Sequence, residues 1–288
     1  MSQTAMIAAC VIFGVLVVYR RKLHAFVYAM WGSYYVYILR NIILPVSGTH
    51  RKRRLASHFH CKVLTPGNAE AIITLNQDIP LTDLEQVIPY ESARSLILKS
   101  PVDVVAYECA CRQSRKTHCE PTQVCMVIGR PHTDFILKIH PGTSRRISTE
   151  EALDILKTAH ASGNVHTAWF KDTMKGRFYA LCNCCSCCCF GLDAMNRLDT
   201  PIVAPSGYVA GVANTVCAGC GFCADVCPFS VIEIRDHAAY IDPEKCMGCG
   251  VCVSQCPNQC LSLRREPSRG IPLDVRALAQ AIPTPAHH

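Results

Sequence analysis

Eight cysteines near the C-terminal end of this 288-residue chain stand in two copies of one spacing pattern. The pattern is C-x2-C-x2-C-x3-C-P, and its copies start at residues 217 and 246. They contain Cys217, Cys220, Cys223 and Cys227, and then Cys246, Cys249, Cys252 and Cys256. Thiolates at this spacing are ligands of [4Fe–4S] clusters. A zinc ribbon is disfavoured, because it uses two separated C-x2-C pairs and needs neither the third cysteine nor the proline.

The doubled motif resembles the bacterial two-cluster ferredoxins over residues 209–265. The resemblance implies two [4Fe–4S] clusters that exchange single electrons, each held by three cysteines of one copy and the last cysteine of the other. The expected sets are Cys217, Cys220, Cys223 with Cys256, and Cys246, Cys249, Cys252 with Cys227. One further cysteine, Cys260, is interpreted as a small buried hydrophobic residue rather than a ligand.

Ten more cysteines lie in two central segments, which is more than packing requires. They are Cys109, Cys111, Cys119, Cys125, Cys182, Cys184, Cys185, Cys187, Cys188 and Cys189. Vicinal cysteines have poor geometry for disulfides, and short spacings of this kind indicate metal ligation in a reducing compartment. We therefore predict at least one additional iron–sulfur centre here, with Arg112 and His118 as possible hydrogen-bond donors to its thiolates.

The type of the central centre stays open at this point. Each segment could hold its own [4Fe–4S] cluster, or the two segments could share ligands. Adjacent side chains diverge, so Cys185 and Cys187–Cys189 cannot all face one cubane. A double-size cluster, a non-cubane cluster or an iron with an open coordination position is also compatible with the residues. The whole arrangement over residues 70–263 resembles a group of poorly characterised iron–sulfur proteins from anaerobic bacteria. This resemblance implies a redox function in anaerobic metabolism but does not indicate a substrate.

Short elements must position the central cysteines. Val102–Tyr107 is predicted to be a strand that leads to Cys109, and Ala71–Leu75 another strand. Capping boxes open helices at Thr82 and Ser148. The helix after Ser148 is followed by two predicted strands, 165–170 and 177–181. Helix followed by hairpin favours a winged-helix-like element, interpreted as a scaffold for the cysteines rather than a nucleic-acid contact.

The N-terminal region favours a membrane. Ala5–Tyr19 is free of charge and is followed directly by Arg20, Arg21 and Lys22, so it is predicted to be a short membrane helix. The first 54 residues hold eight Lys or Arg and no Asp or Glu, within a chain of net charge +7. Leu23–Val46 is rich in Tyr and is predicted to be an interfacial helix, with a second membrane span as the alternative. The segment His58–Cys61 is predicted to be solvated and to lie beside the membrane.

The sequence thus predicts an α+β protein with four regions. These are a membrane anchor and basic segment (1–54), a Cys-rich α/β domain (55–208), a 2[4Fe–4S] ferredoxin domain (209–265) and a C-terminal tail (266–288). The expected function is single-electron transfer through iron–sulfur clusters, to or from a partner protein of unknown identity, at the cytoplasmic side of a membrane. The alternatives are a reductase with its active centre at the central cysteines and an iron–sulfur redox sensor. The sequence has no Gly-rich phosphate-binding loop, so it gives no support for a flavin or nicotinamide cofactor.

Overall fold

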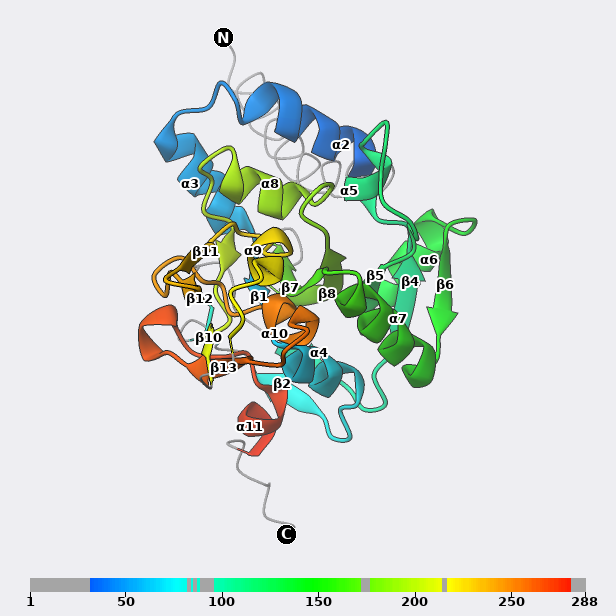
Figure 1. Ribbon diagram of the computed structural model, residues 1–288. Helices are drawn as coiled ribbons and strands as arrows, with labels where there is room; N and C mark the ends of the chain where they lie inside the picture. Colours follow the sequence, from blue (N-terminus) through cyan, green and yellow to red (C-terminus); the bar gives the residue numbers. More distant parts are fainter. Residues whose placement is uncertain are drawn as a thin grey trace, which may run out of the picture.

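The structure is a computed structural model that describes residues 32–280 except 82–83, 85–86, 89–95, 172–176 and 214–216 (Figure 1). A seven-stranded sheet forms its centre. In sheet order the strands are β6 (Ser144–Ile147), β4 (Val104–Tyr107), β5 (Cys125–Ile128), β8 (Arg177–Cys184), β7 (Val165–Lys171), β1 (Phe59–Val63) and β9 (Val203–Ala204). Neighbouring strands are antiparallel except β1 and β9, which run parallel.

Apolar residues cover both faces of the sheet. All seven residues of β7 are buried, and they alternate between two cores: Ala168 and Phe170 face one, Val165 and Trp169 the other. The first core is completed by α4 (Pro66–Ile73), α7 (Thr149–Ala161), α11 (Val275–Gln280) and the hairpin of β2 (Ile79–Leu81) and β3 (Leu96–Leu98). A strand buried on both sides is usually almost wholly apolar, but β7 also buries the polar side chains of His166, Thr167 and Lys171.

The second core contains two of the central cysteines, Cys184 and Cys189, and Cys111 and Cys182 pack against it. It is formed by α2 (Gly32–Ile38), the π-helix η1 (Leu39–Ile43), α3 (Thr49–His58) and α8 (Phe190–Asn196), which contribute Val36, Leu39, Ala56 and Phe190. The short helix α5 (Ala110–Gln113) follows β4, and α6 (His132–Ile139) packs beside β4, β5 and β6. This layer therefore brings the N-terminal helices onto the same face as the cysteines.

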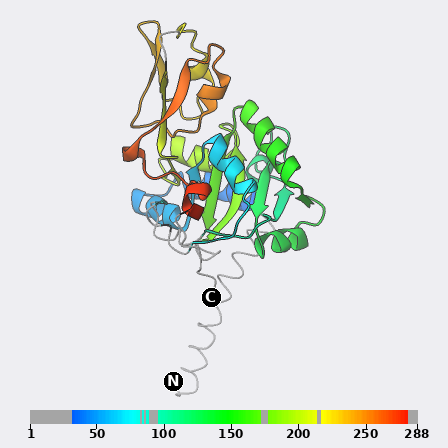
Figure 2. The same cartoon turned by 90° about the horizontal axis from the view of Figure 1, so that it is seen from below.

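The C-terminal region forms a separate lobe beside the sheet, drawn in yellow and orange (Figure 2). It contains two strand pairs, β10 (Tyr208–Val212) with β13 (Leu261–Arg265) and β11 (Ile232–Arg235) with β12 (Ala238–Ile241). Its helices are α9 (Phe222–Asp225) and α10 (Val251–Gln255), and a 3-10 turn, η3 (Pro267–Arg269), follows β13. The chain then returns to the sheet, where Leu273 and Val275 are fully buried.

Several local predictions are confirmed. The strand before Cys109 is β4, and the predicted hairpin is β7–β8, with β8 extending to Cys184. The helix predicted after Ser148 is α7, and the Ser148 side chain accepts a hydrogen bond from the Glu151 amide at 3.1 Å, as a capping residue does.

The predicted fold class needs two corrections. The winged-helix-like element is wrong, because β8 pairs with β5 and β7 pairs with β1, so the hairpin lies inside a seven-stranded sheet and is not a free wing. The segment Ala71–Leu75 is mostly helix α4 rather than a strand, because Thr65 caps the Asn68 amide and Pro66 starts the helix.

The predicted N-terminal membrane helix is not supported. Within residues 32–280, as far as they are described, no helix is both long enough and apolar enough to cross a membrane. The segment Ala5–Tyr19 itself lies outside the described residues. The described part of the predicted interfacial helix Leu23–Val46 is α2 and η1, whose Val36, Leu39 and Leu44 are buried in the second core.

Close contact between α8 and β7 positions the turn that carries the cysteines, and it depends on Gly191. A Cβ added there would lie 2.8 Å from the buried Trp169 ring. We predict that Gly191→Ala destabilises the protein by about 1–3 kcal/mol, the usual cost of overpacking a core. Gly142→Ala is the control, because its Cβ would meet nothing within 4 Å. Thermal unfolding of anaerobically purified proteins checks this, and equal midpoints for both variants would contradict it.

Candidate metal centres

The first ferredoxin-type cavity joins cysteines from both copies of the motif. Cys217, Cys220 and Cys223 line it together with Cys256 of the second copy, around a space of about 290 Å³. The amide of Ala239 donates to the Cys217 thiol at 3.4 Å, and this bond and one from the Gly219 amide lower the pKa of Cys217. Amide donors of this kind stabilise thiolates, which are the ligand form of cysteine.

The second ferredoxin-type cavity is the crossed counterpart. Cys246, Cys249 and Cys252 line it with Cys227 of the first copy, around about 300 Å³. Three of these thiols are buried, and burial raises the pKa of Cys249 to about 12. The Ala210 amide donates to the Cys246 thiol at 3.4 Å. The helices that follow the two loops start at Gly221 and Gly250, whose positive φ values of 81° and 80° favour glycine.

The structure thus groups the eight cysteines in the two expected sets of four. Four thiols around each cavity are the donor set of a cubane cluster, so the residues fit the implied cofactor. The ligand assignment itself stays a prediction. Cys260 is buried in the first cavity wall, with its sulfur 3.4 Å from that of Cys256, which agrees with its interpretation as a small buried residue.

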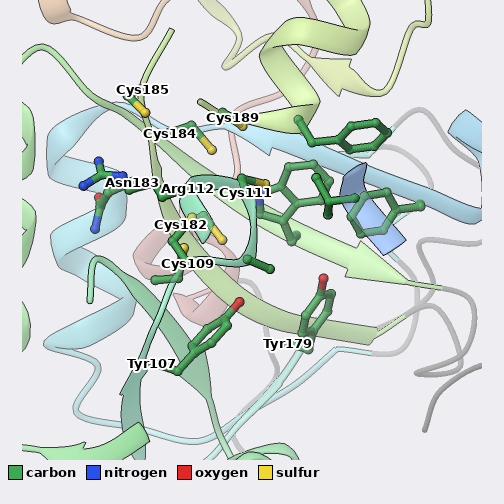
Figure 3. Close-up of a pocket in the computed structure, with 16 residues that line it drawn as sticks. Tyr107, Cys109, Cys111, Arg112, Tyr179, Cys182, Asn183, Cys184, Cys185 and Cys189 are labelled. Atoms are coloured by element: carbon green, nitrogen blue, oxygen red, sulfur yellow. The ribbon is translucent and has the colours of Figure 1, made fainter. Parts of the chain in front are cut away.

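Seven of the ten central cysteines line a third cavity, and one of them, Cys185, also belongs to a second set of thiols described below. The other six are Cys109, Cys111, Cys125, Cys182, Cys184 and Cys189. Their thiols form a chain of hydrogen-bond neighbours in the order Cys182, Cys125, Cys109, Cys111, Cys189, Cys184. Figure 3 shows the labelled sulfurs converging from the loop after β4, from β8 and from the turn before α8. We call these residues the six-thiol site.

The six-thiol site has more room and more thiols than either ferredoxin-type cavity. Its space is about 550 Å³, against about 290 and 300 Å³. Aromatic side chains form part of its wall, among them Tyr107, Trp169 and Tyr179, with Asn183 and Arg112 nearby (Figure 3). This donor set can hold a cubane with thiols to spare, or a larger iron–sulfur cluster.

Burial makes the six-thiol site costly without a metal. The pKa of Cys109 rises to about 12 through its hydrogen bond with Cys111 and through burial. In Cys184 the pKa also reaches about 12: a hydrogen bond with Cys189 lowers it, but burial and the neighbouring thiols raise it. A buried thiolate needs a metal or a donor to offset its desolvation. The 20 cysteines that the structure describes form no disulfide, which leaves their thiols available as ligands.

Cys185 and the three remaining central cysteines form a compact set that adjoins this cavity. They are Cys119, Cys185, Cys187 and Cys188, and their sulfurs all lie within 4.8 Å of one another. Cys119 comes from the loop after α5, and the other three from the turn between β8 and α8. We call this the four-thiol site. Sequence spacing placed the ten cysteines in two consecutive segments, whereas the structure takes ligands from both segments into each site.

Two buried arginines hold the loops of these sites. The Arg112 side chain is 1% exposed and donates to the carbonyl of Pro121, in the loop that carries Cys119. The Arg40 side chain donates to the Cys188 carbonyl at 2.5 Å and to Ser114 Oγ at 2.9 Å, and its Nε lies 3.1 Å from Asp193 Oδ2. Arg40 therefore connects η1 to both cysteine segments.

The role of Arg40 is absent from the sequence-based interpretation. Its position in an apolar, basic N-terminal region indicated a membrane, whereas the side chain is 1% exposed inside the protein. Spacing offers no signal for this contact, since Arg40 and Cys188 are 148 residues apart. Asp193, which also pairs with Arg197, was missed for the same reason.

Two other residues differ from expectation. His118 directs Nδ1 toward the Cys119 carbonyl (3.4 Å) and the Glu120 carboxylate (3.5 Å). The segment around His60 and Cys61 is strand β1 and is fully buried, so it is not a solvated segment beside a membrane. Burial lowers the pKa of His60 to about 4.

The comparisons with known proteins identify one region. Residues 211–257 match the family model of the 4Fe–4S dicluster domain. This match agrees with the two crossed sets of four cysteines, and the chain therefore contains a 4Fe–4S dicluster domain beside a Cys-rich region that can bind metal. No curated protein matches the chain.

Loss of two thiols of the six-thiol site should remove iron from that site alone. We predict that the double variant Cys111→Ala with Cys184→Ala contains less iron and sulfide per chain, while the EPR signals of the reduced dicluster domain persist. Its sheet domain should also unfold at lower temperature, because metal binding contributes folding energy. Iron and sulfide analysis with EPR checks this. Unchanged iron together with titratable free thiols would contradict an iron–sulfur centre here.

Proposed function

We propose that the protein transfers single electrons between a redox partner and the six-thiol site, through the dicluster domain. Clusters bound by these thiol sets supply one-electron centres. The observation that carries the proposal is a continuous apolar contact. Cys249 of the second ferredoxin-type set belongs to the same buried cluster of side chains as Cys184 and Cys189 of the six-thiol site.

The three sets of thiols stand in an order from surface to interior. Cys220 of the first set is exposed, and Phe222 beside it is 43% exposed. Cys223 of this set shares an apolar cluster with Cys246 and Cys252 of the second set. Cys249, Met247 and Val251 of the second set and its loop belong to the same buried cluster as Cys184 and Cys189 of the six-thiol site. This order supports electron entry or exit at Cys220.

Met247 and Val251 carry the last contact in a way that excludes water. Both are at most 5% exposed, and Val226 and Phe229 pack against the same cluster. When packed side chains exclude water from the space between two redox centres, less solvent has to reorient as the electron moves, and the reorganisation energy of the transfer is lower. The geometry therefore suits electron exchange between the dicluster domain and the sheet domain better than a role for either alone.

Electron entry at the exposed end can be tested with the full chain. Cys220→Ala removes the exposed thiol of the first set, and we predict that reduction of the central centre by a soluble one-electron donor slows by at least an order of magnitude. Stopped-flow absorption measures the rate. Cys260→Ala is the matched control, since Cys260 lines the same cavity and is not an expected ligand. An unchanged rate in Cys220→Ala would show that electrons enter elsewhere.

We also propose that the protein binds the surface of an anionic membrane on its cytoplasmic side. Tyr34, Tyr37, Ile42 and Val46 are 50–79% exposed on α2, on η1 and just after it. Helix α3 follows with Arg51, Arg53 and Arg54 exposed. An apolar row next to basic residues supports peripheral binding to anionic lipid.

Vesicle binding tests this second proposal. We predict that the full chain co-sediments with vesicles that contain anionic lipid, and that Arg53→Glu with Arg54→Glu weakens this binding by at least roughly thirtyfold, at about 1 kcal/mol per lost positive charge. Arg276→Glu, on α11, is the control for charge alone. Equal binding of both variants, or no preference for anionic vesicles, would refute the membrane proposal and leave the electron-transfer proposal intact.

A reductase is the second candidate function. The observation in its favour is the size of the six-thiol site, whose cavity is nearly twice that of either ferredoxin-type cavity and has six thiols where a cubane uses four. Space beyond a cubane would admit a substrate. Turnover of a small oxidant by the reduced protein, abolished in Cys111→Ala, would support it.

A further inference from the structure

We propose that the four-thiol site, formed by Cys119, Cys185, Cys187 and Cys188, binds a single tetrahedral divalent metal ion, Zn²⁺ or Fe²⁺, separately from the iron–sulfur clusters. The ion would be structural. It would join the loop after α5 to the turn between β8 and α8, and these two segments also supply ligands to the six-thiol site.

The distances between the sulfurs carry the inference. A tetrahedral ion with metal–sulfur bonds of about 2.3 Å places its four sulfurs about 3.8 Å apart. Two distances match this value: the sulfur of Cys188 lies 3.8 Å from that of Cys119 and 3.6 Å from that of Cys187. The sulfurs of Cys119 and Cys187 are 2.7 Å apart, so these two side chains must separate to the tetrahedral spacing when the ion binds. With all four sulfurs within 4.8 Å of one another, the set encloses one ion.

A cubane cluster does not fit this spacing. In a cubane each thiolate binds a different iron, so the four thiolates lie outside a cage of four irons and four sulfides and stand well apart. The two ferredoxin-type sets provide an internal comparison. Among the described residues, neither of them gathers its sulfurs within 4.8 Å, and the four-thiol site does.

The local backbone explains how five near-consecutive cysteines serve two sites. The chain reverses between β8 and α8, where the Cys189 amide donates to the Cys185 carbonyl at 3.1 Å. In this turn Cys184 and Cys189 line the cavity of the six-thiol site, and Cys187 and Cys188 approach Cys119. Cys185 lies between the two sites, in the wall of that cavity and within the compact set. The divergence of adjacent side chains thus divides the ligands between a cluster and a single ion.

Buried positive charge supplies an independent observation. Four thiolates around a divalent ion carry a net charge of −2. Arg112 is 1% exposed, its Nε has no hydrogen-bond partner within the described part of the chain, and its guanidinium interacts electrostatically with Cys185 and Cys119 as well as with Cys109 and Cys125. Arg40 is already paired with Asp193 and contributes a hydrogen bond to the Cys188 carbonyl. The buried Arg112 guanidinium therefore offsets part of the charge of such a complex.

The exposure of the ligands fits entry of an ion from solution. Cys187 is exposed and Cys119 is partly exposed, whereas Cys185 and Cys188 are buried. Four protein thiolates close the coordination shell, which is typical of structural sites rather than catalytic ones. The site therefore has a path for the metal and no position for a substrate.

Metal analysis of the anaerobically purified full chain tests the proposal. Zinc, iron and sulfide per chain are measured for the wild type and for Cys119→Ser with Cys187→Ser, and Cys10→Ser is the control for loss of a lone thiol. We expect the double variant to lose one metal ion per chain while sulfide and the EPR signals of the reduced clusters stay unchanged. The lost ion is either zinc, or an iron whose oxidised form gives the EPR signal of a high-spin ferric tetrathiolate.

X-ray absorption on the wild type keeps the test valid if the double variant fails to fold. If the ion is zinc, the zinc edge should show four sulfur neighbours at about 2.3 Å and no neighbouring metal. If it is iron, its edge coincides with that of the cluster irons, and the oxidised wild type should instead give the EPR signal of a high-spin ferric tetrathiolate. Loss of about four irons with four sulfides in the variant would identify a cubane and overturn the proposal. A wild-type protein with no such metal, in which Cys119 and Cys187 are alkylated as free thiols or found as a disulfide, would overturn it as well. Both failures leave the dicluster EPR signals, and with them the electron-transfer proposal, unaffected.

Discussion

The cost of burying thiolates is the constraint on which this structure depends. A thiolate inside a protein is stable only beside a metal ion or a hydrogen-bond donor. The dicluster domain meets this constraint with backbone amides at Cys217 and Cys246. The sheet domain carries eleven further thiols, Cys61 included, and seven of them are buried. Backbone amides donate to Cys109, Cys111 and Cys189, and two buried arginines lie nearby. We propose that metal binding meets the rest of the cost and so helps to hold the second core together.

The arrangement of the layers follows from this constraint. One core of the sheet is an ordinary apolar core, formed by α4, α7 and α11. The other includes cysteines on both sides of its contact with the dicluster domain, from Cys61 and Cys184 to Cys249. Because that core is continuous, thiols of the two regions contribute to one buried cluster of side chains.

The sequence predicted the parts of the molecule that depend on local spacing. The repeated motif of the dicluster domain is confirmed by the family match, and the capping box of α7 and the strand before Cys109 are local patterns too. What could not be predicted depends on contacts between distant residues. The seven-stranded sheet pairs β1 with both β7 and β9, and the division of ten cysteines into sets of six and four depends on one turn and one loop. Arg40 could not be placed from the sequence for the same reason. An apolar stretch with one basic residue is the sequence pattern of a helix at a membrane surface and also of a buried helix with an internal ion pair, which is what the structure has.

Magnetic coupling between centres tests the central claim most directly. If the six-thiol site holds an iron–sulfur centre packed against the second ferredoxin-type set, EPR spectra of the fully reduced wild-type protein should show spin–spin interaction beyond that of the dicluster pair. That additional interaction should disappear when Cys111 and Cys184 are replaced by alanine. A wild-type spectrum that contains only the paired signals of the dicluster domain, unchanged in the double variant, would contradict the account.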